Sequence, residues 1–151
     1  MELDFLPEKI LNIVEKNYHK LSEVRFRKNF PISVLLDGKR RFISESGFTD
    51  KSDFGICCEQ ADIDYIINRV TEKSLYAFND EIKNGYVTTK NGIRIGLSGT
   101  CVTESGKIVT IKNFTSLNVR LPHKINNCSD TIYDVIFEKN KKFIKSTLII
   151  A

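Results

Sequence analysis

The sequence predicts an α+β domain made mostly of antiparallel sheet, with three or four helices. Three kinds of pattern favour this class: apolar residues at helical spacing, short runs that alternate polar and apolar residues, and tight-turn sequences between those runs. With 151 residues, 41% of them hydrophobic, the chain has the size of one domain and can bury one sizeable core.

The first third of the chain predicts one helix followed by strands. Apolar residues recur at helical spacing over Leu6–Leu21, which predicts an amphipathic helix. Glu23–Arg27 alternates polar and apolar residues, as a half-buried strand does, and Asp37-Gly38 is a typical hairpin turn. Ser44–Asp53 is rich in Ser, Gly and Asp and predicts an exposed loop. The strands expected here are Glu23–Arg27, Ile32–Leu36 and Arg40–Ile43.

The middle of the chain predicts two helices and then two hairpins. Gln60–Thr71 has an apolar inner face, and Ser74 and Gly85 suit the N-terminal and C-terminal caps of a second helix. From Tyr86 the alternation of strands returns, with turn residues between the runs. The strands expected here are Tyr86–Thr89, Ile93–Val102, Lys107–Lys112 and Leu117–Leu121, before a last helix over Thr131–Lys139.

The final segment, Ser146–Ala151, follows a basic stretch and is a continuous run of mostly apolar residues. Such a run is typical of a strand buried on both faces of a parallel sheet, which cannot exist without its neighbours. An ordinary edge strand is the alternative. We favour the first interpretation, in which residues 1–144 form one domain and residues 145–151 belong to a following one.

Composition and motifs argue against several function classes. A net charge of +4 is too small to indicate a nucleic-acid protein without a localised patch, and no apolar run approaches the ~20 residues of a spanning helix. We therefore expect a soluble intracellular protein. The cysteines are scattered, with no zinc-site spacing, and are expected to be free thiols. They are Cys57, Cys58, Cys101 and Cys128.

Catalytic machinery is not evident in this chain, but four arginines could contact an anion. There is no phosphate-binding loop and no recognisable acid–base pair, so the chain is not expected to be an enzyme by itself. Arg25 and Arg27 share one face of a predicted strand, and Arg94 and Arg120 lie in two later strands. Guanidinium groups suit phosphate or carboxylate. The alternative is a solvated sheet face with weak surface ion pairs.

A series of short motifs resembles the stage III sporulation protein AA family of spore-forming bacteria. In order along the chain these are Glu23-Val-Arg-Phe-Arg, Ser74-Leu-Tyr-Ala, Glu81-Ile-Lys-Asn-Gly-Tyr, Gly92-Ile-Arg-Ile-Gly-Leu-Ser-Gly and Ser116-Leu-Asn-Val-Arg. The family is similar to the hexameric ATPases of type II and type IV secretion and pilus systems. The resemblance implies a PAS-like N-terminal domain, with residues 145–151 as the first strand of a RecA-like ATPase domain.

The resemblance also implies roles for the arginines and for partners. Arg94 and Arg120 are the first candidates for contacting nucleotide in the full-length protein, and Arg25 and Arg27 are weaker ones. ATP and Mg are implied for the full-length protein, and no cofactor for this chain. The implied partners are the RecA-like domain, further copies in a homo-hexamer and membrane-embedded sporulation channel proteins. The implied location is the cytoplasm of the mother cell, peripheral at the membrane.

A nucleic-acid-binding module is the alternative function. It would use a basic set from the first two predicted hairpin strands and their neighbours, although the modest net charge argues against it. Steeply salt-dependent binding of RNA or DNA would favour it. The set is Arg25, Arg27, Lys28, Arg40 and Arg41.

Overall fold

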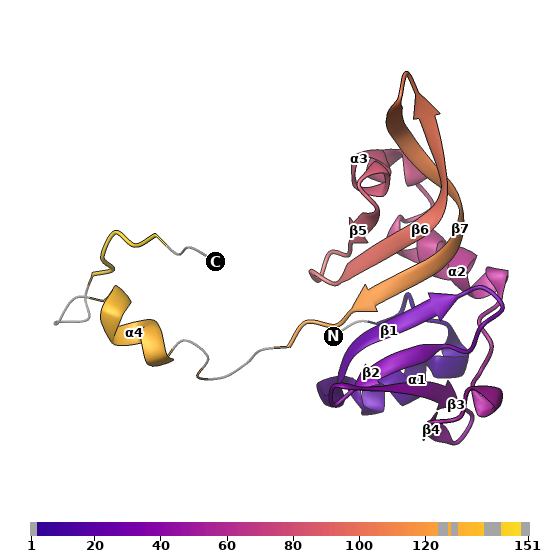
Figure 1. Ribbon diagram of the computed structural model, residues 1–151, viewed down its shortest axis with the longest axis horizontal. Helices are drawn as coiled ribbons and strands as arrows, with labels where there is room; N and C mark the ends of the chain where they lie inside the picture. The colour runs from indigo at the N-terminus through magenta and orange to yellow at the C-terminus, as the bar shows by residue number, and fades with distance from the viewer. Residues whose placement is uncertain (1–2, 124–126, 128–129, 138–142, 149–151) are drawn as a thin grey trace.

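One antiparallel sheet of seven strands, in the order β4-β3-β2-β1-β7-β6-β5, organises the chain (Figure 1). The computed structural model describes residues 3–123, 127, 130–137 and 143–148. The strands are β1 (Leu21–Arg27), β2 (Ser33–Leu36), β3 (Lys39–Ser44), β4 (Gly47–Thr49), β5 (Tyr86–Thr88), β6 (Arg94–Glu104) and β7 (Lys107–Arg120). The α-helices are α1 (Glu8–Lys16), α2 (Gln60–Val70), α3 (Asn79–Lys83) and α4 (Asp130–Ile136).

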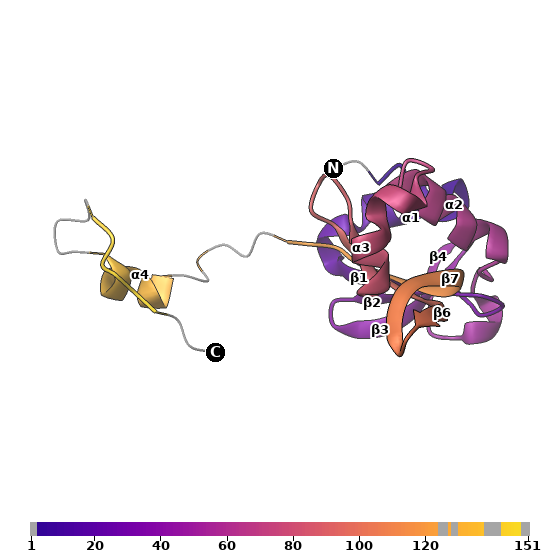
Figure 2. The same ribbon diagram turned by 90° about the horizontal axis from the view of Figure 1, so that it is seen from above.

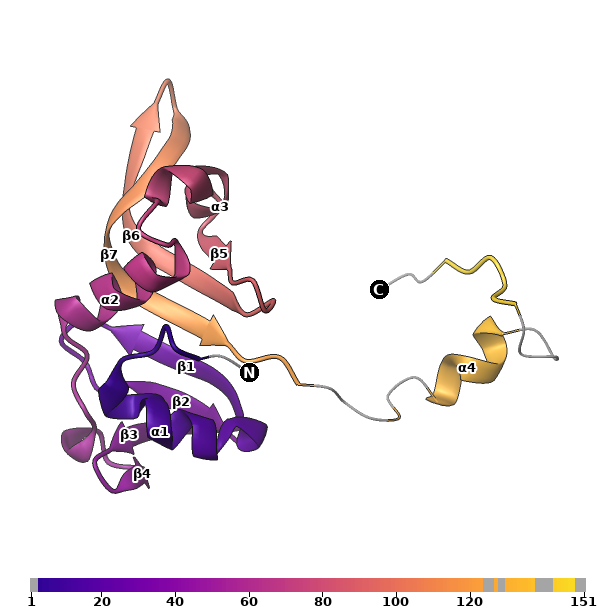
Figure 3. The same cartoon turned by 180° about the vertical axis from the view of Figure 1, so that it is seen from behind.

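Helices α1, α2 and α3 lie on the same face of the sheet (Figures 2 and 3). Their apolar sides supply buried residues such as Ile10, Ile66 and Ile82. On the same side, the strands contribute fully buried side chains that include Val24 and Ile95. The other face of the sheet carries no described α-helix, and the short 3-10 helix Ser52–Phe54 borders it beside β3. We call this second face the open face.

The pairing of β1 with β7 joins two parts of the sheet that are far apart in the sequence. Residues 23–27 of β1 pair with residues 116–120 of β7. Strands β4 to β2 extend the sheet from β1, and strands β6 and β5 extend it from β7. The β6–β7 hairpin also projects beyond the rest of the sheet (Figure 1), because β5 and β1 pair with only one end of it.

The predicted α+β class is confirmed, including the hairpin at Asp37-Gly38 and the helix that starts at Gln60. A PAS-like arrangement is compatible with this sheet. Gly85 has a φ of +81° after α3, as a helix-ending glycine should. Ser74, however, makes no capping hydrogen bond, and a 3-10 helix over Leu75–Phe78 precedes α3.

Three predicted elements differ from the structure. The helix expected over Leu6–Leu21 is an α-helix only over Glu8–Lys16, and Leu21 already begins β1. The segment expected to be a loop contains β4, which pairs with β3 and closes a tight turn at Gly47. The two strands expected over Lys107–Lys112 and Leu117–Leu121 are one continuous strand, β7. An irregularity between Ser98 and Thr100 of β6 shifts the register along this hairpin and breaks the alternation that the sequence shows.

The last described residues form a small unit around α4. The rings of Tyr133 and Phe137 stack at 4.4 Å, and the amide of Lys145 donates to the carbonyl of Ile136 at 2.8 Å. Residues 145–148 have no regular structure, and Leu148 is 83% exposed. Residues 149–151, Cys128 and much of the basic stretch lie outside the described residues. The separate domain over 145–151 therefore stays a prediction.

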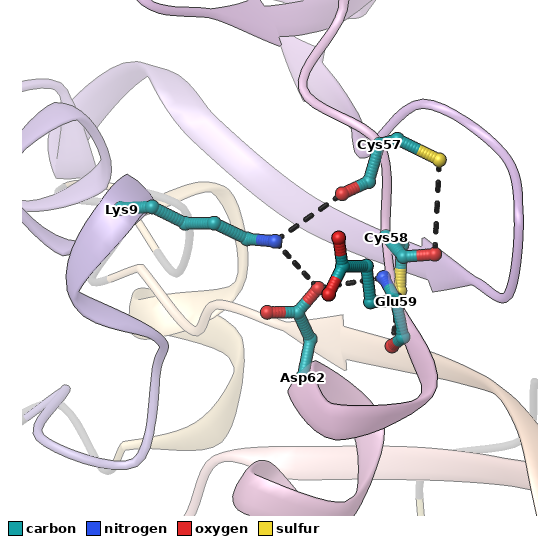
Figure 4. Close-up of polar contacts among 5 residues, drawn as sticks. All are labelled: Lys9, Cys57, Cys58, Glu59 and Asp62. Atoms are coloured by element: carbon teal, nitrogen blue, oxygen red, sulfur yellow. Dashed lines mark hydrogen bonds and ion pairs between the residues drawn. The ribbon is translucent and has the colours of Figure 1, made fainter.

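One carboxylate ties α1 to the start of α2 (Figure 4). Asp62 accepts a hydrogen bond from the backbone amide of Glu59 at 2.7 Å and caps the helix, while Lys9 of α1 contacts the same oxygen at 2.6 Å. Lys9 also donates to the carbonyl of Cys57 at 3.2 Å. Burial raises the pKa of the neighbouring Cys58 to about 12, and the charge of Asp62 adds to that effect. Cys58 is therefore a protonated core thiol.

We expect Asp62→Ala to lower the free energy of unfolding by about 1–3 kcal/mol, because the substitution removes a helix cap and leaves Lys9 without its partner. Urea denaturation would measure the loss. Asp64→Ala, in the same helix but exposed, serves as the control and should change stability by less than about 0.5 kcal/mol. Equal losses in the two variants would contradict the role of Asp62.

Candidate functional site

The open face carries the arginines that the sequence singled out, arranged in cross-strand rows. The first row, read from β3 to β5, is Arg40, Leu35, Glu23, Arg120, Arg94 and Thr88. The second row is Phe42, Ser33, Arg25, Asn118, Gly96 and Tyr86. The third and shorter row is Arg27, Ser116 and Ser98. Because side chains of alternate strand residues share a face, all three rows point to the same side.

Arg94 and Arg120 are direct register partners on neighbouring strands. The guanidinium of Arg94 lies 4.0 Å from the centroid of the Tyr86 ring, a cation–π contact. Within the described residues, neither arginine forms an ion pair within 4 Å. Like charges directly opposite each other destabilise a sheet. The fold therefore places two cations at opposite positions, and Tyr86 and the nearby Glu23 offset part of their repulsion. Both line a cavity of about 270 Å³.

Glu23 lies beside this pair and holds Arg25. Its side chain is 11% exposed, and Arg25 donates to its carboxylate at 2.8 Å. Burial raises the pKa of Glu23, but hydrogen bonds from Arg25 and Asn118 and the charges of Arg25 and Arg120 outweigh burial, so the pKa lies below its ordinary 4.5. The same hydrogen bond raises the pKa of Arg25. Glu23 is thus ionised at neutral pH, and Arg25 is already paired.

A larger cavity, of about 620 Å³, adjoins the smaller one on the open face. Its walls combine cationic, aromatic and hydroxyl side chains. These are Arg25, Arg27 and Arg40, then Phe30 and Phe42, then Ser33, Ser98 and Ser116. Asn118 lines both cavities, and its Oδ1 atom is buried without a hydrogen-bond partner in the described structure. An unpaired buried acceptor is uncommon and indicates a place for a donor.

The structure separates the four predicted arginines into two groups on one face. Arg94 and Arg120 line the smaller cavity, while Arg25 and Arg27 line the larger one. Sequence reasoning did not identify Glu23. The period-two pattern could have found it, since residue 23 must share a face with residues 25 and 27. The neighbours of Arg94 and Arg120 could not be found this way, because they depend on register.

The basic set of the alternative nucleic-acid function lies on one surface only in part: Arg25, Arg27 and Arg40 share the larger cavity, and Lys28 shares another cavity with Arg27. Arg41 has the opposite orientation to Arg40 in β3 and pairs with Asp50. Lys28 also lines a cavity beside α2 and β7. Across the described ranges, no group of three His, Cys, Asp or Glu side chains could hold a metal ion, and no helix has the length and apolarity to cross a membrane.

Fold and site together define an α+β domain whose open sheet face is basic and contains cavities large enough for a small ligand. A family model described as "Sporulation stage III, protein AA" matches residues 4–151. The chain therefore belongs to the stage III sporulation protein AA family, which confirms the resemblance in its motifs. It is 26% identical over 141 residues to the stage III sporulation protein AA of Bacillus subtilis (strain 168), covering 91% of this chain and 42% of that protein. The chain thus spans less than half of this relative. No solved structure matches.

Glu23 should make the stability of the domain depend on acid pH. A carboxylate whose pKa is lowered by folding stabilises the folded state above its unfolded pKa, near 4.5, and this contribution is lost as the pH falls through the folded value. At neutral pH we expect Glu23→Gln to cost about 1–2 kcal/mol, because Arg25 and Arg120 lose their acid.

Urea denaturation of the protein and the variant at several pH values would check this expectation. The difference between them should narrow as the pH falls below 4.5. Glu104→Gln, at the exposed tip of the β6–β7 hairpin, is the control. A difference that stays constant down to low pH would show that Glu23 acts through packing alone.

Proposed function

We propose that this chain is the N-terminal, non-catalytic domain of a sporulation ATPase related to the motor ATPases of secretion systems. In this proposal the full-length protein powers a transport channel between mother cell and forespore. Membership of the stage III sporulation protein AA family supports the sporulation role. The 42% share of the relative's length agrees with a domain that works together with a larger remainder.

The observation that carries the proposal is the pairing of Arg94 with Arg120 on the open face. The two arginines are register partners, and neither forms an ion pair within 4 Å among the described residues. Like charges at opposite positions of a sheet lower the stability of the free domain. A phosphate group brought to this face would turn that repulsion into attraction. Cations placed where charge develops during phosphoryl transfer lower its barrier, as an arginine finger does.

The remaining machinery belongs, in this proposal, to the rest of the full-length protein. A RecA-like domain supplies the phosphate-binding loop and holds ATP and Mg, and this chain supplies charge at the interface. The open face then meets that domain, of the same or a neighbouring copy in a homo-hexamer. The assembly works in the cytoplasm of the mother cell and reaches the membrane through its channel partners, without nucleic acid.

In the full-length protein we expect Arg94→Ala and Arg120→Ala each to lower ATP turnover by about 10-fold or more, the scale of a lost contact to transition-state charge. The melting temperature should barely move, because the relief of a like-charge contact is offset by the loss of the Tyr86 contact of Arg94 or of the Arg120 charge beside Glu23. Phosphate release and thermal unfolding would be measured on the same preparations.

Arg69→Ala is the matched control for these variants. Arg69 is an arginine of α2, on the helix-covered side, and its ion pair with Asp4 is exposed. This variant should keep normal turnover. Normal turnover in both Arg94→Ala and Arg120→Ala would refute the nucleotide role. Parallel losses of turnover and stability would assign the two arginines to the sheet instead.

We also expect the 151-residue chain alone to release no phosphate from Mg-ATP above the buffer rate. Phosphoryl transfer needs a backbone cradle, a lysine and a metal, and the sequence contains no phosphate-binding loop. Turnover that persists through repeated purification would contradict the assignment of a non-catalytic domain.

A further inference from the structure

The larger cavity of the open face holds cations that are not neutralised within the described chain. Arg25 is paired with Glu23, but neither Arg27 nor Arg40 forms an ion pair within 4 Å among the described residues. Guanidinium groups stay charged at every physiological pH. Two unpaired cations on the walls of one concave site favour an anionic ligand.

Both cations are held by aromatic rings. The guanidinium carbon of Arg27 lies 4.3 Å from the centroid of Phe30, and that of Arg40 lies 5.7 Å from the centroid of Phe42. A ring contact occupies the flat face of a guanidinium and restrains it, while the N–H groups at its edge remain available. Those edges are the part that binds phosphate oxygens in a bidentate way. The two arginines are therefore oriented by neighbours that do not compete with an anion.

The cavity also offers surface for a planar ring. Phe30 is 49% exposed although it belongs to a cavity wall, and Pro31 and Leu97 add apolar area nearby. A half-exposed phenyl ring loses water contact favourably when a flat aromatic group stacks on it. An anion without a ring would leave this apolar surface exposed to water.

The polar groups between these walls suit a ligand that carries hydrogen-bond donors. Ser33, Ser98 and Ser116 present hydroxyls along the floor, which can donate or accept. The Oδ1 atom of Asn118 is an acceptor only, and it is the buried atom without a partner in the described structure. A ribose hydroxyl or an exocyclic amine would satisfy it.

These requirements converge on one class of ligand, and we propose that the larger cavity binds a mononucleotide: a planar ring, a donor-bearing sugar and a phosphate. A volume of about 620 Å³ lies within the range of small-molecule pockets. Neither Arg94 nor Arg120 lines this cavity. The inference therefore does not rest on the ATPase role, and it concerns the 151-residue chain by itself.

Calorimetric titration of the 151-residue chain tests the proposal with matched probes. AMP and GMP contain all three parts, adenosine lacks the phosphate, and ribose 5-phosphate lacks the ring. We expect AMP or GMP to bind at least about 10-fold more tightly than adenosine and ribose 5-phosphate, since each of these probes lacks one anchoring group. No binding of either nucleotide up to about 1 mM would overturn the proposal.

Variants place the ligand in the cavity. Arg27→Gln and Arg40→Gln should each weaken nucleotide binding by about 10-fold or more, and Phe30→Leu should reduce the preference for AMP over ribose 5-phosphate. Arg41→Gln is the matched control, because Arg41 is the next residue of the same strand and pairs with Asp50 on the other side. Thermal unfolding would confirm that each variant folds.

Two outcomes would refute the site. One is unchanged nucleotide affinity in both Arg27→Gln and Arg40→Gln. The other is single-stranded RNA that binds far more tightly than the mononucleotide with a steep salt dependence, which would assign the face to nucleic acid. The first result leaves the proposed role of Arg94 and Arg120 in the full-length protein untouched, because the titration involves no hydrolysis. The second would instead favour the alternative nucleic-acid function.

Discussion

The ladder between β1 and β7 is the contact on which the rest of the domain depends. It joins residues 23–27 to residues 116–120 and thereby makes one sheet from two groups of strands that are far apart in the sequence. The core under α1, α2 and α3 continues across this seam, through Val24 and Phe26 on one side and Leu117 and Val119 on the other. The same ladder places Glu23 next to Arg120 and Arg25 next to Asn118. Core and candidate site therefore depend on the same ladder.

Because the α-helices cover one side of the sheet, the residues of the open face meet different requirements from those of the core. A sheet face without helices must remain soluble, and here it does so with arginines and serines rather than with balanced ion pairs. Aromatic side chains take the place of acids: Tyr86, Phe30 and Phe42 each lie against a guanidinium. Glu23 is the acid of the central rows, and it is fully engaged. The aromatic rings and Glu23 restrain the arginines of this face, and the net positive charge remains available to bind an anion.

The sequence was sufficient for the fold class and for most elements, because periodicity and turn residues are local signals. Asp37-Gly38 and Gly85 mark real turns for that reason. Two errors arose where a local signal was weak or broken: the three residues of β4, and the register shift after Ser98 that disguised β7 as two strands. The shared face of Arg25 and Arg27 followed from alternation. The juxtaposition of Arg94 with Arg120 did not, because it requires the register of β6 against β7 and knowledge of which face the helices cover.

The single strand β7 spans two very different surroundings. Its last residues, 116–120, pair with strands on both sides, whereas residues 107–112 pair with β6 alone. Within that first half, Asn79 of α3 donates to the carbonyl of Val109 and Ile111 packs in the core, so the tip of the hairpin is the least supported part. Amide protons leave a protein by local opening, and a two-stranded ribbon opens more easily than the centre of a sheet. Deuterium should therefore enter the hairpin tip around Glu104 and Lys107 before it enters residues 116–120. The projecting ribbon can fray and re-form while the strand stays anchored at the seam, so local disorder at its tip need not reach the arginine face.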